Sequence, residues 1–410
     1  METVVPVGST TVAEPSLAVR SRPAPFGLRR RFLVPFGAAL ACVIAGLAAL
    51  VPSGNLLLPF EQTTVLEGKM ASKGDFFEDP EVKRLLMRHH LQVHVTRTGS
   101  RDVALHELAG YDVVFPSGQP SADLIIAQRQ SQSPPAYTRV YRPFTSPIVL
   151  ATYREYAQTL EAAKIATPLA GAPEGHSLYY SLDLAKFLAA AADPAMTWNK
   201  LGLKRFDVSN GNAVLAHSPN VCSSNSSGTY MGLVAFVSNG NRVPRDLAEA
   251  TALAQKIKPL VTAQGLPGAD LFRPYITPEG KGSAPVIVVY EHQFLSYQMG
   301  QKAHTGHVDD SRVLLYPDTN FLTQPQLIAL NPQGDRLSRL VTEDPDLRRR
   351  AVELGFRVLA PDAVTESLPL AQHLAGQGVQ VPEFGGNDTK AVLPELPLFE
   401  EMIKVTGGCP

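Results

Sequence analysis

Strand-like and helix-like segments alternate along the first folded stretch of the chain. Thr63 to Met70 and Tyr111 to Phe115 have the composition of strands, and Leu91 to Thr96 alternates apolar and polar residues. A helical pattern runs from Pro80 to His90, with Asp79 as its predicted N-cap. This order predicts a parallel sheet with helices on its faces. Further helices are predicted over Asp102 to Ala109 and from about Ser121.

A second region of the same kind follows, and the chain then returns. Pro147 to Thr152 and Val286 to Tyr290 are apolar strand segments. Val313 to Tyr316 is another strand, and a last helix follows Asp344 and ends at Gly355. A chain that leaves one lobe, builds a second and comes back forms two lobes with a cleft between them. Helices inside the second region are predicted over Leu182 to Ala192, from Thr229, and over Pro244 to Gln264.

The predicted fold class is α/β, with two lobes that each contain a mostly parallel sheet flanked by helices. Residues 62–148 form the first part of lobe I, 149–310 form lobe II, and 311–410 return to lobe I and add a C-terminal extension. Before them come a basic tail, 1–31, and a membrane span, 32–52.

The span is predicted from an uncharged run, Phe32 to Val51, which as a helix extends about 30 Å, the thickness of a bilayer core. Basic residues precede it, so the positive-inside rule predicts a cytoplasmic N-terminus and an extracytoplasmic globular part at the cell membrane. A retained signal anchor is favoured. The alternatives are a secretory signal cleaved near small residues such as Ala48, and a lipoprotein signal ending at Cys42. The basic residues are Arg20, Arg22, Arg29, Arg30 and Arg31.

Charge and cysteine content narrow the choice of partners. The formal net charge of -1 gives no reason to expect nucleic acid as a partner. Cys222 and Cys409 are the cysteines of the globular part, and an oxidising compartment permits them to pair. Two unpaired thiols are an equal alternative.

Several segments, taken in order, resemble bacterial extracellular solute-binding proteins of the type II periplasmic-binding fold. The resemblance covers most of Gln62 to Val358. It is closest to the molybdate-binding-like branch, in which a similar last strand and helix stand where Tyr316 to Arg357 stand here. It implies capture of a small polar solute between two lobes and delivery to an ABC-type permease, without naming the solute. The segments include TVLEGKMASKGDFFEDPEVKRLL, YDVVFPSGQPSADLI, SNSSGTYMGLVAFVSNGN and VIVVYEHQFL.

The strongest candidate for a binding site is the serine-rich run from Ser223 to Tyr230, which follows a strand and opens a helix. Free N–H groups and the dipole of a helix N-terminus attract anions and carbonyl oxygens, and hydroxyl groups add donors. The alternative interpretation is that one serine merely caps the helix. The predicted ligand contacts in this run are Asn225, Ser226, Ser227, Thr229 and Tyr230.

Three loops of lobe I follow successive predicted strands, namely 71–75, 98–101 and 117–119, and loops placed in this way share one edge of a parallel sheet. Ser72 and Ser117 come directly after their strands and are predicted to contact the ligand. Lys73 and Arg101 would neutralise an anionic ligand, unless they are ordinary surface cations.

Glu291 follows the most apolar strand of lobe II and is the remaining candidate contact. A carboxylate facing the cleft would favour a cationic or amine-bearing ligand and disfavour a plain oxyanion. The alternative is that Glu291 caps the helix after it. Tyr290 is the other residue of this segment that would line the cleft.

Motifs of catalysis are missing from the sequence, which has no G-x-S-x-G, no H-E-x-x-H and no P-loop. We therefore expect no enzyme, cofactor or metal site. The favoured hypothesis is a solute-binding protein of a transporter. The alternative is a membrane-anchored interaction or sensing subunit of the cell envelope that keeps this fold. An envelope hydrolase is a distant third, which a serine and a histidine within hydrogen-bond reach would favour.

Overall fold

The computed structural model describes residues 26–50, 63–169, 175–263, 270–358, 368–382 and 389–409. The chain divides into two compact units, Met1–Leu58 and Pro59–Pro410. The first contains helix α1, Phe26–Leu50. Within the described ranges, no helix combines the length and the apolar character needed to cross a membrane. The predicted span is therefore not supported and remains a prediction from sequence, and most of the predicted tail, 1–31, lies outside the described residues.

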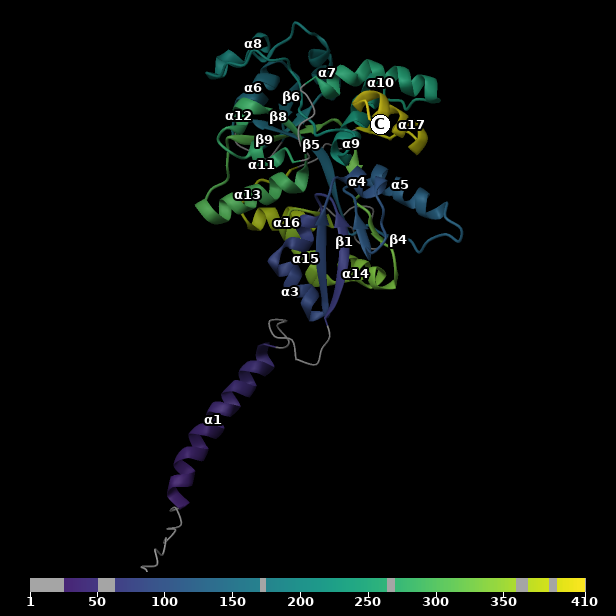
Figure 1. Cartoon of the computed structure of the whole chain (residues 1–410). Coiled ribbons are helices and arrows are strands. Elements are labelled where there is room, and N and C mark those ends of the chain that lie inside the picture. The colour runs from purple at the N-terminus through teal and green to yellow at the C-terminus, as the bar shows by residue number, and fades with distance from the viewer. Residues whose placement is uncertain are drawn as a thin grey trace, which may run out of the picture. The chain divides into compact units, whose positions relative to one another are not determined.

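A five-stranded sheet organises lobe I of the second unit (Figure 1). Its order is β2-β1-β3-β12-β4, and β2, β1 and β3 run parallel, as predicted. β12 returns from late in the sequence and lies antiparallel between β3 and β4. The strands are β1 (Thr64–Met70), β2 (Leu91–Arg97), β3 (Val113–Phe115), β4 (Arg139–Tyr141) and β12 (Leu327–Ala329).

At β3 both faces of this sheet are buried. Val113 and Phe115 face the main hydrophobic core, and Val114 between them packs in a smaller core with residues of α4 and α5. A strand covered on both sides is apolar throughout, which is typical of parallel sheets. Asp79 caps α3 through its side chain, as predicted. The helices of lobe I are α2 (Gly74–Glu78), α3 (Pro80–Arg88), α4 (Ser100–Leu105), α5 (Gln119–Gln130), α14 (Pro332–Glu343) and α15 (Pro345–Glu353).

The second sheet is built on β5, whose ten residues are all buried. The first part of β5 pairs with β11 and β13, and its second part pairs with β8 and β9. The sheet continues from β9 through β7 to β6. The strands are β5 (Phe144–Tyr153), β6 (Ala166–Pro168), β7 (Tyr179–Leu182), β8 (Val286–Tyr290), β9 (Arg312–Pro317), β11 (Leu322–Thr323) and β13 (Arg357–Val358).

Two predictions about lobe II are wrong. Its sheet is not mostly parallel, because β8 and β9 both run opposite to β5, and only β7 and β9 pair in parallel. β5 carries the chain out of lobe I, so strands that return beside it must be antiparallel. The predicted boundary at 310/311 also lies one strand too early, since β9, Arg312–Pro317, pairs inside this sheet.

Helices surround the second sheet, and a two-stranded sheet of β10 (Thr319–Asn320) and β14 (Thr389–Lys390) lies apart from it. The longer helices are α6 (Arg154–Ala162), α7 (Leu184–Ala192), α9 (Asn225–Ser238), α10 (Leu247–Thr262), α13 (Glu291–Thr305), α16 (Leu368–Gly376) and α17 (Leu396–Gly407). Short turns of helix are α8 (Trp198–Leu201), η1 (Leu203–Phe206), α11 (Phe272–Tyr275) and α12 (Gly280–Ser283).

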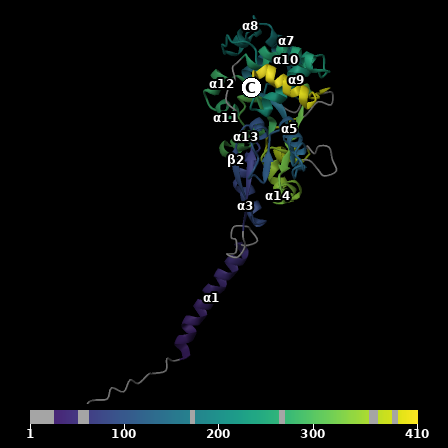
Figure 2. The same cartoon turned by 45° about the vertical axis from the view of Figure 1, so that its right-hand side comes forward.

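The C-terminal helix α17, which lies in the predicted C-terminal extension, packs on α10 and α9 of lobe II (Figures 1 and 2). Phe399, Met402 and Ile403 are buried in this contact and belong to the main core. A disulfide between Cys222 and Cys409, 187 residues apart in sequence, joins the end of α17 to the loop before α9. The pairing that the sequence left open is therefore present.

Removing this disulfide should weaken the fold. Closing a long loop lowers the entropy of the unfolded chain, and the loss typically amounts to about 2–4 kcal/mol. We expect Cys222→Ser/Cys409→Ser to lower the free energy of unfolding by that amount in urea titrations. Cys42→Ser, which leaves the bridge intact, is the control. Equal stability of the two proteins would contradict the structural role of the bridge.

Candidate functional site

Three loops meet at one edge of the first sheet because their strands end at the same level. Met70 at the end of β1 is in register with Arg97 of β2 and with Phe115 of β3. The residues that follow these strands therefore lie side by side, as predicted for a parallel sheet. The hydroxyl oxygens of Ser72 and Ser117 are 2.7 Å apart. Ser100 accepts a hydrogen bond of 3.0 Å from the backbone N–H of Ser117.

The serine-rich run of lobe II faces this edge from the other side. α9 begins at Asn225, four residues earlier than predicted, because Ser224 is its N-cap and accepts from the N–H of Ser227 at 3.5 Å. Ser226 therefore belongs to the first helical turn, where its hydroxyl lies 2.9 Å from that of Ser224. Burial of nearly the whole helix in lobe II stabilises this early start despite its polar residues.

Two glycines let the lobes approach closely here. A side chain at Gly99 would lie 2.7 Å from the carbonyl oxygen of Ser223, and one at Gly118 would collide with the amide of Asn225. Asn225 fills the space thus left and accepts a hydrogen bond of 3.2 Å from Ser121 of α5. Its amide group also donates to the Tyr290 hydroxyl at 3.2 Å. Asn225 thus joins the lobes instead of lining the site.

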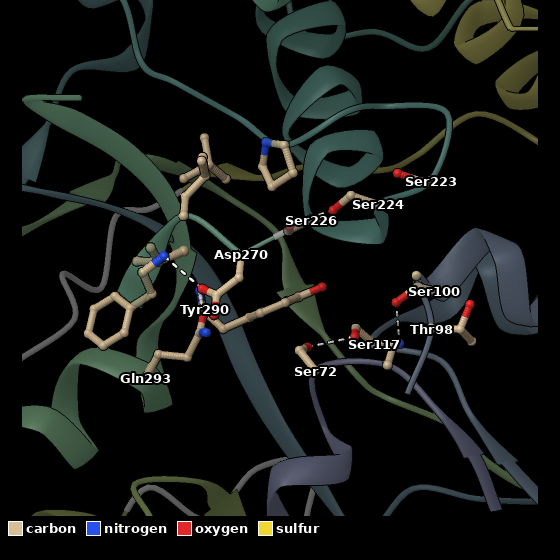
Figure 3. A pocket seen from close by; sticks show the side chains of 17 residues that line it. Ser72, Thr98, Ser100, Ser117, Ser223, Ser224, Ser226, Asp270, Tyr290 and Gln293 are labelled. Atoms are coloured by element: carbon tan, nitrogen blue, oxygen red, sulfur yellow. Dashed lines mark hydrogen bonds between the residues drawn. The ribbon is translucent and has the colours of Figure 1, made fainter. Parts of the chain in front are cut away.

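A small cavity of about 80 Å³ remains between the lobes (Figure 3). The serines after β1 and β3 lie on one side of it and those at the start of α9 on the other, with Tyr290 extending between them. This volume suits a small group such as a tetrahedral oxyanion. The polar side chains that line it belong to Ser72, Thr98, Ser100, Ser117, Ser223, Ser224, Ser226, Asp270, Tyr290 and Gln293.

Hydroxyl groups dominate this lining, and Asp270 is the one residue in it with a charged side chain. The carboxylate of Asp270 is exposed, accepts from the N–H groups of Phe272 and Arg273, and lies 3.3 Å from the Arg273 side chain. Its negative charge is therefore largely compensated outside the cavity. The cavity itself presents neutral donors and the positive end of α9, which favours a negatively charged or strongly polar guest.

A wider groove of about 680 Å³ adjoins the cavity and shares Ser72, Thr98, Phe272 and Gln293 with it. Arg97 lines this groove, but its guanidinium already pairs with Asp75 and Glu78. The groove thus connects the serine cavity to solvent through a surface whose charges are mostly paired.

Lys73 and Arg101, the two predicted cations, do not line the cavity. Lys73 is fully buried, and its amine lies 3.3 Å from the centre of the Tyr290 ring. Arg101 is buried as well and makes two hydrogen bonds, of 2.8 and 2.6 Å, with Glu400 of α17. Neither is a surface cation. Arg101 binds lobe I to the C-terminal helix, which sequence could not show because the two residues are 299 positions apart.

Glu291, predicted as a contact, is withdrawn from the cleft. Its carboxylate is 0% exposed and accepts from Arg357 at 2.7 and 2.8 Å and from the Tyr316 hydroxyl at 2.9 Å. A carboxylate held by a buried guanidinium has no oxygen left for a ligand. The expectation of a cationic ligand, which depended on Glu291, therefore loses its basis.

Three further predicted contacts in α9 also point away from the cavity. Ser227 pairs with Ser218 at 3.0 Å, Thr229 accepts from Asn225 at 3.3 Å, and Tyr230 lies in the core. Burial raises the pKa of Tyr230 well above its usual value. Of the predicted contacts, the structure brings Ser72, Ser117 and Ser226 to the cavity.

Several lining residues were not among the predicted contacts. Ser100, Ser223 and Ser224 belong to loops that the sequence did indicate, where each loop offers several hydroxyl groups and only packing decides which ones face inward. Asp270 and Phe272 come from a segment without a motif, and no sequence signal pointed to them.

One serine and one histidine lie within hydrogen-bond reach of each other, the arrangement that would favour the envelope-hydrolase hypothesis. The Ser146 hydroxyl is 3.0 Å from Nδ1 of His292 and also accepts from the His292 backbone N–H at 3.1 Å. Ser146 is 0% exposed and lines neither the cavity nor the groove. A nucleophile must reach its substrate, so this pair serves the start of α13 instead.

Glu291→Gln should separate stability from binding. The change leaves the buried Arg357 guanidinium without a full countercharge, which typically costs about 3–5 kcal/mol. We expect a lower free energy of unfolding in urea, with ligand affinity unchanged at temperatures where the variant stays folded. Glu343→Gln, at an exposed position of α14, is the control. A loss of affinity without a loss of stability would return Glu291 to the binding site.

No protein-family model matches this chain, and no curated protein matches it. Similar solved structures include the sulfate-binding protein SubI from Mycobacterium tuberculosis H37Rv, at 13% identity and a TM-score of 0.45 over 84% of this chain and 96% of that one. Iron-bound HitA from Pseudomonas aeruginosa is similar at 10% identity and a TM-score of 0.48, over 84% and 98%. The periplasmic binding protein AfuA from Actinobacillus pleuropneumoniae, with fructose-6-phosphate bound, is similar at 9% identity and a TM-score of 0.46, over 84% and 97%.

These neighbours are solute-binding proteins, the class that the sequence resembles. Identities and TM-scores this low carry no argument about the ligand, and the molybdate-binding-like branch remains a prediction.

Proposed function

We propose that this protein binds a small oxyanion in the serine cavity between its lobes, as the extracytoplasmic binding component of an ABC-type transporter. The observation that carries the proposal is the convergence of hydroxyl groups from three strand ends of lobe I and from the first turn of α9 on one cavity of about 80 Å³. Hydroxyl and backbone donors bind oxyanions well, and the positive end of a helix favours their charge.

Neutral donors make this a site for reversible capture. The proposal involves no chemical step, and the hydroxyl groups in the cavity have no histidine among the other lining residues. Ligand entry through the groove and release by separation of the lobes fit a two-lobed protein in which polar contacts, such as those of Asn225 and Arg101, join the lobes beside the cavity.

The extracytoplasmic location and the membrane anchor are part of the same proposal. Support comes from the basic and apolar segments at the N-terminus and from the Cys222–Cys409 disulfide, since such bridges persist in oxidising compartments.

A second candidate is an envelope interaction or sensing subunit. The observation in its favour is the ion pair between Arg101 and Glu400, through which α17 of lobe II holds lobe I without any ligand. A protein whose lobes are held by its own side chains has less need of a solute to close.

Thermal-shift measurements on residues 62–410 with sulfate, molybdate and phosphate should test the binding proposal. A ligand at about 100 times its dissociation constant stabilises a protein by roughly 2.7 kcal/mol, which raises the melting temperature measurably. We expect one of these anions to do so, and Ser226→Ala to weaken its binding about tenfold. Ser238→Ala, at the other end of α9, is the matched control. If no anion shifts the folded protein, the interaction subunit becomes the better proposal.

Membrane attachment is tested by fractionation of cells that express the full chain. We expect the protein in the membrane fraction, released by detergent and not by salt, and accessible to protease from outside the cell. Deletion of 1–51 should move it to the soluble fraction. Recovery of the full chain as a soluble protein would contradict the anchor.

A further inference from the structure

Lys73 is an unusual residue because its amine lies inside the protein and not in solvent. The side chain is 0% exposed, and no described residue accepts a hydrogen bond from its amine. An ammonium group in such surroundings is costly unless an opposite charge lies near. Most lysines avoid this cost by reaching solvent, so the burial of Lys73 beside the cavity calls for an explanation.

One aromatic ring separates this amine from the serine cavity. Nζ of Lys73 lies 3.3 Å from the centre of the Tyr290 ring and 5.9 Å from that of Phe356. Tyr290 lines the cavity and extends between the serines of the two lobes (Figure 3). Ser72, the residue before Lys73, lines it as well. Lys73 is therefore the basic group placed immediately behind the cavity wall, and the ring between them stabilises a positive charge once the amine is protonated.

The titratable groups around Lys73 do not supply a negative charge inside the protein. Tyr290 remains neutral, since burial raises its pKa well above the usual range. Burial and the nearby Lys73 lower the pKa of His292, which is thus uncharged at neutral pH. Asp75 on α2 is the acidic neighbour, but it is exposed and pairs with Arg97. Burial accordingly lowers the pKa of Lys73 well below its ordinary value, and Asp75 opposes this only in part.

We propose that Lys73 makes the serine cavity selective for anions by taking up a proton when an anion enters. An anion on the far side of the Tyr290 ring provides the countercharge that the amine lacks, so the ligand favours the ammonium form and the ammonium form favours the ligand. The two effects are equal by linkage. The inference rests on the proposed function. It adds that Lys73 is the residue whose protonation depends on the negative charge of the ligand.

The sign of the pH dependence follows from this linkage. Above the pKa of the ligand-free protein the amine must gain a proton on binding, so affinity falls as the pH rises. With one coupled proton, the dissociation constant increases up to about tenfold per pH unit, until the pH exceeds the pKa of Lys73 in the complex. Below the ligand-free pKa the affinity becomes independent of pH.

Calorimetric titration can measure the proton directly. Sulfate is the first probe, because its charge is constant between about pH 6 and 9; molybdate and phosphate follow, with the proton of phosphate itself subtracted. Each titration is done at one pH in two buffers of different ionisation enthalpy, and repeated across this pH range. We expect uptake of up to one proton, and an affinity that falls with pH.

Two lysine variants isolate the source of this proton. Lys73→Met should still bind the anion, more weakly and without proton uptake or pH dependence. Lys69→Met is the matched control, because Lys69 is also buried at the end of β1 but lies over the Tyr111 ring instead. His292→Gln should keep the proton uptake, and circular dichroism verifies that each variant is folded.

The outcomes separate this inference from the proposed function. If wild-type protein binds none of the anions, the proposed function fails. If it binds an anion without proton uptake, or if Lys73→Met retains the uptake, the inference about Lys73 is overturned while anion binding stands. If Lys73→Met does not fold, the wild-type protein and His292→Gln decide: uptake that disappears with the histidine overturns the inference, and uptake that persists supports it.

Discussion

The close approach of α9 to the first sheet is the contact on which the arrangement of this protein depends. Asn225 at the start of the helix occupies the space beside Gly118, and it links Ser121 of lobe I to Tyr290 of lobe II through hydrogen bonds. A larger residue than glycine at position 118 would move α9 away from the strand ends. The serines of the two lobes would then no longer share one cavity, and the ring of Tyr290 would lose its place between them.

The polar residues of the cleft are of two kinds, charged side chains that pair with each other and uncharged hydroxyl groups that line the cavity. Charged side chains such as Glu291, Arg357, Arg101 and Glu400 are used within the protein, where each finds an opposite charge and joins distant parts of the chain. The cavity keeps hydroxyl groups, which carry no charge to be compensated in the empty protein. Lys73 differs from both kinds, since it is a buried amine without a described acceptor, and it lies against the Tyr290 ring that lines the cavity.

The C-terminal helix gives this fold a second connection between the lobes. α17 is covalently tied to lobe II by the disulfide and reaches Arg101 of lobe I through Glu400. A helix in this position limits how far the lobes can separate on the side of α4, so opening for a ligand has to take place mainly at the groove.

Local and periodic features were determined by the sequence itself. The order of β1, α3, β2 and β3 follows from apolar periodicity and from the cap at Asp79, and the parallel arrangement places Ser72 and Ser117 after neighbouring strand ends. These features depend on residues close in sequence, and their physical causes act within a few positions.

Only the tertiary structure decided which polar residues face the cavity. Glu291 and Arg101 looked available in the sequence, and each is taken by a partner far along the chain, Arg357 and Glu400. The direction of β8 and β9 depended in the same way on where β5 crosses between the lobes. Long-range pairing of charges and strands leaves no local pattern, because its free energy arises only when the folded chain brings the partners together and excludes water from between them.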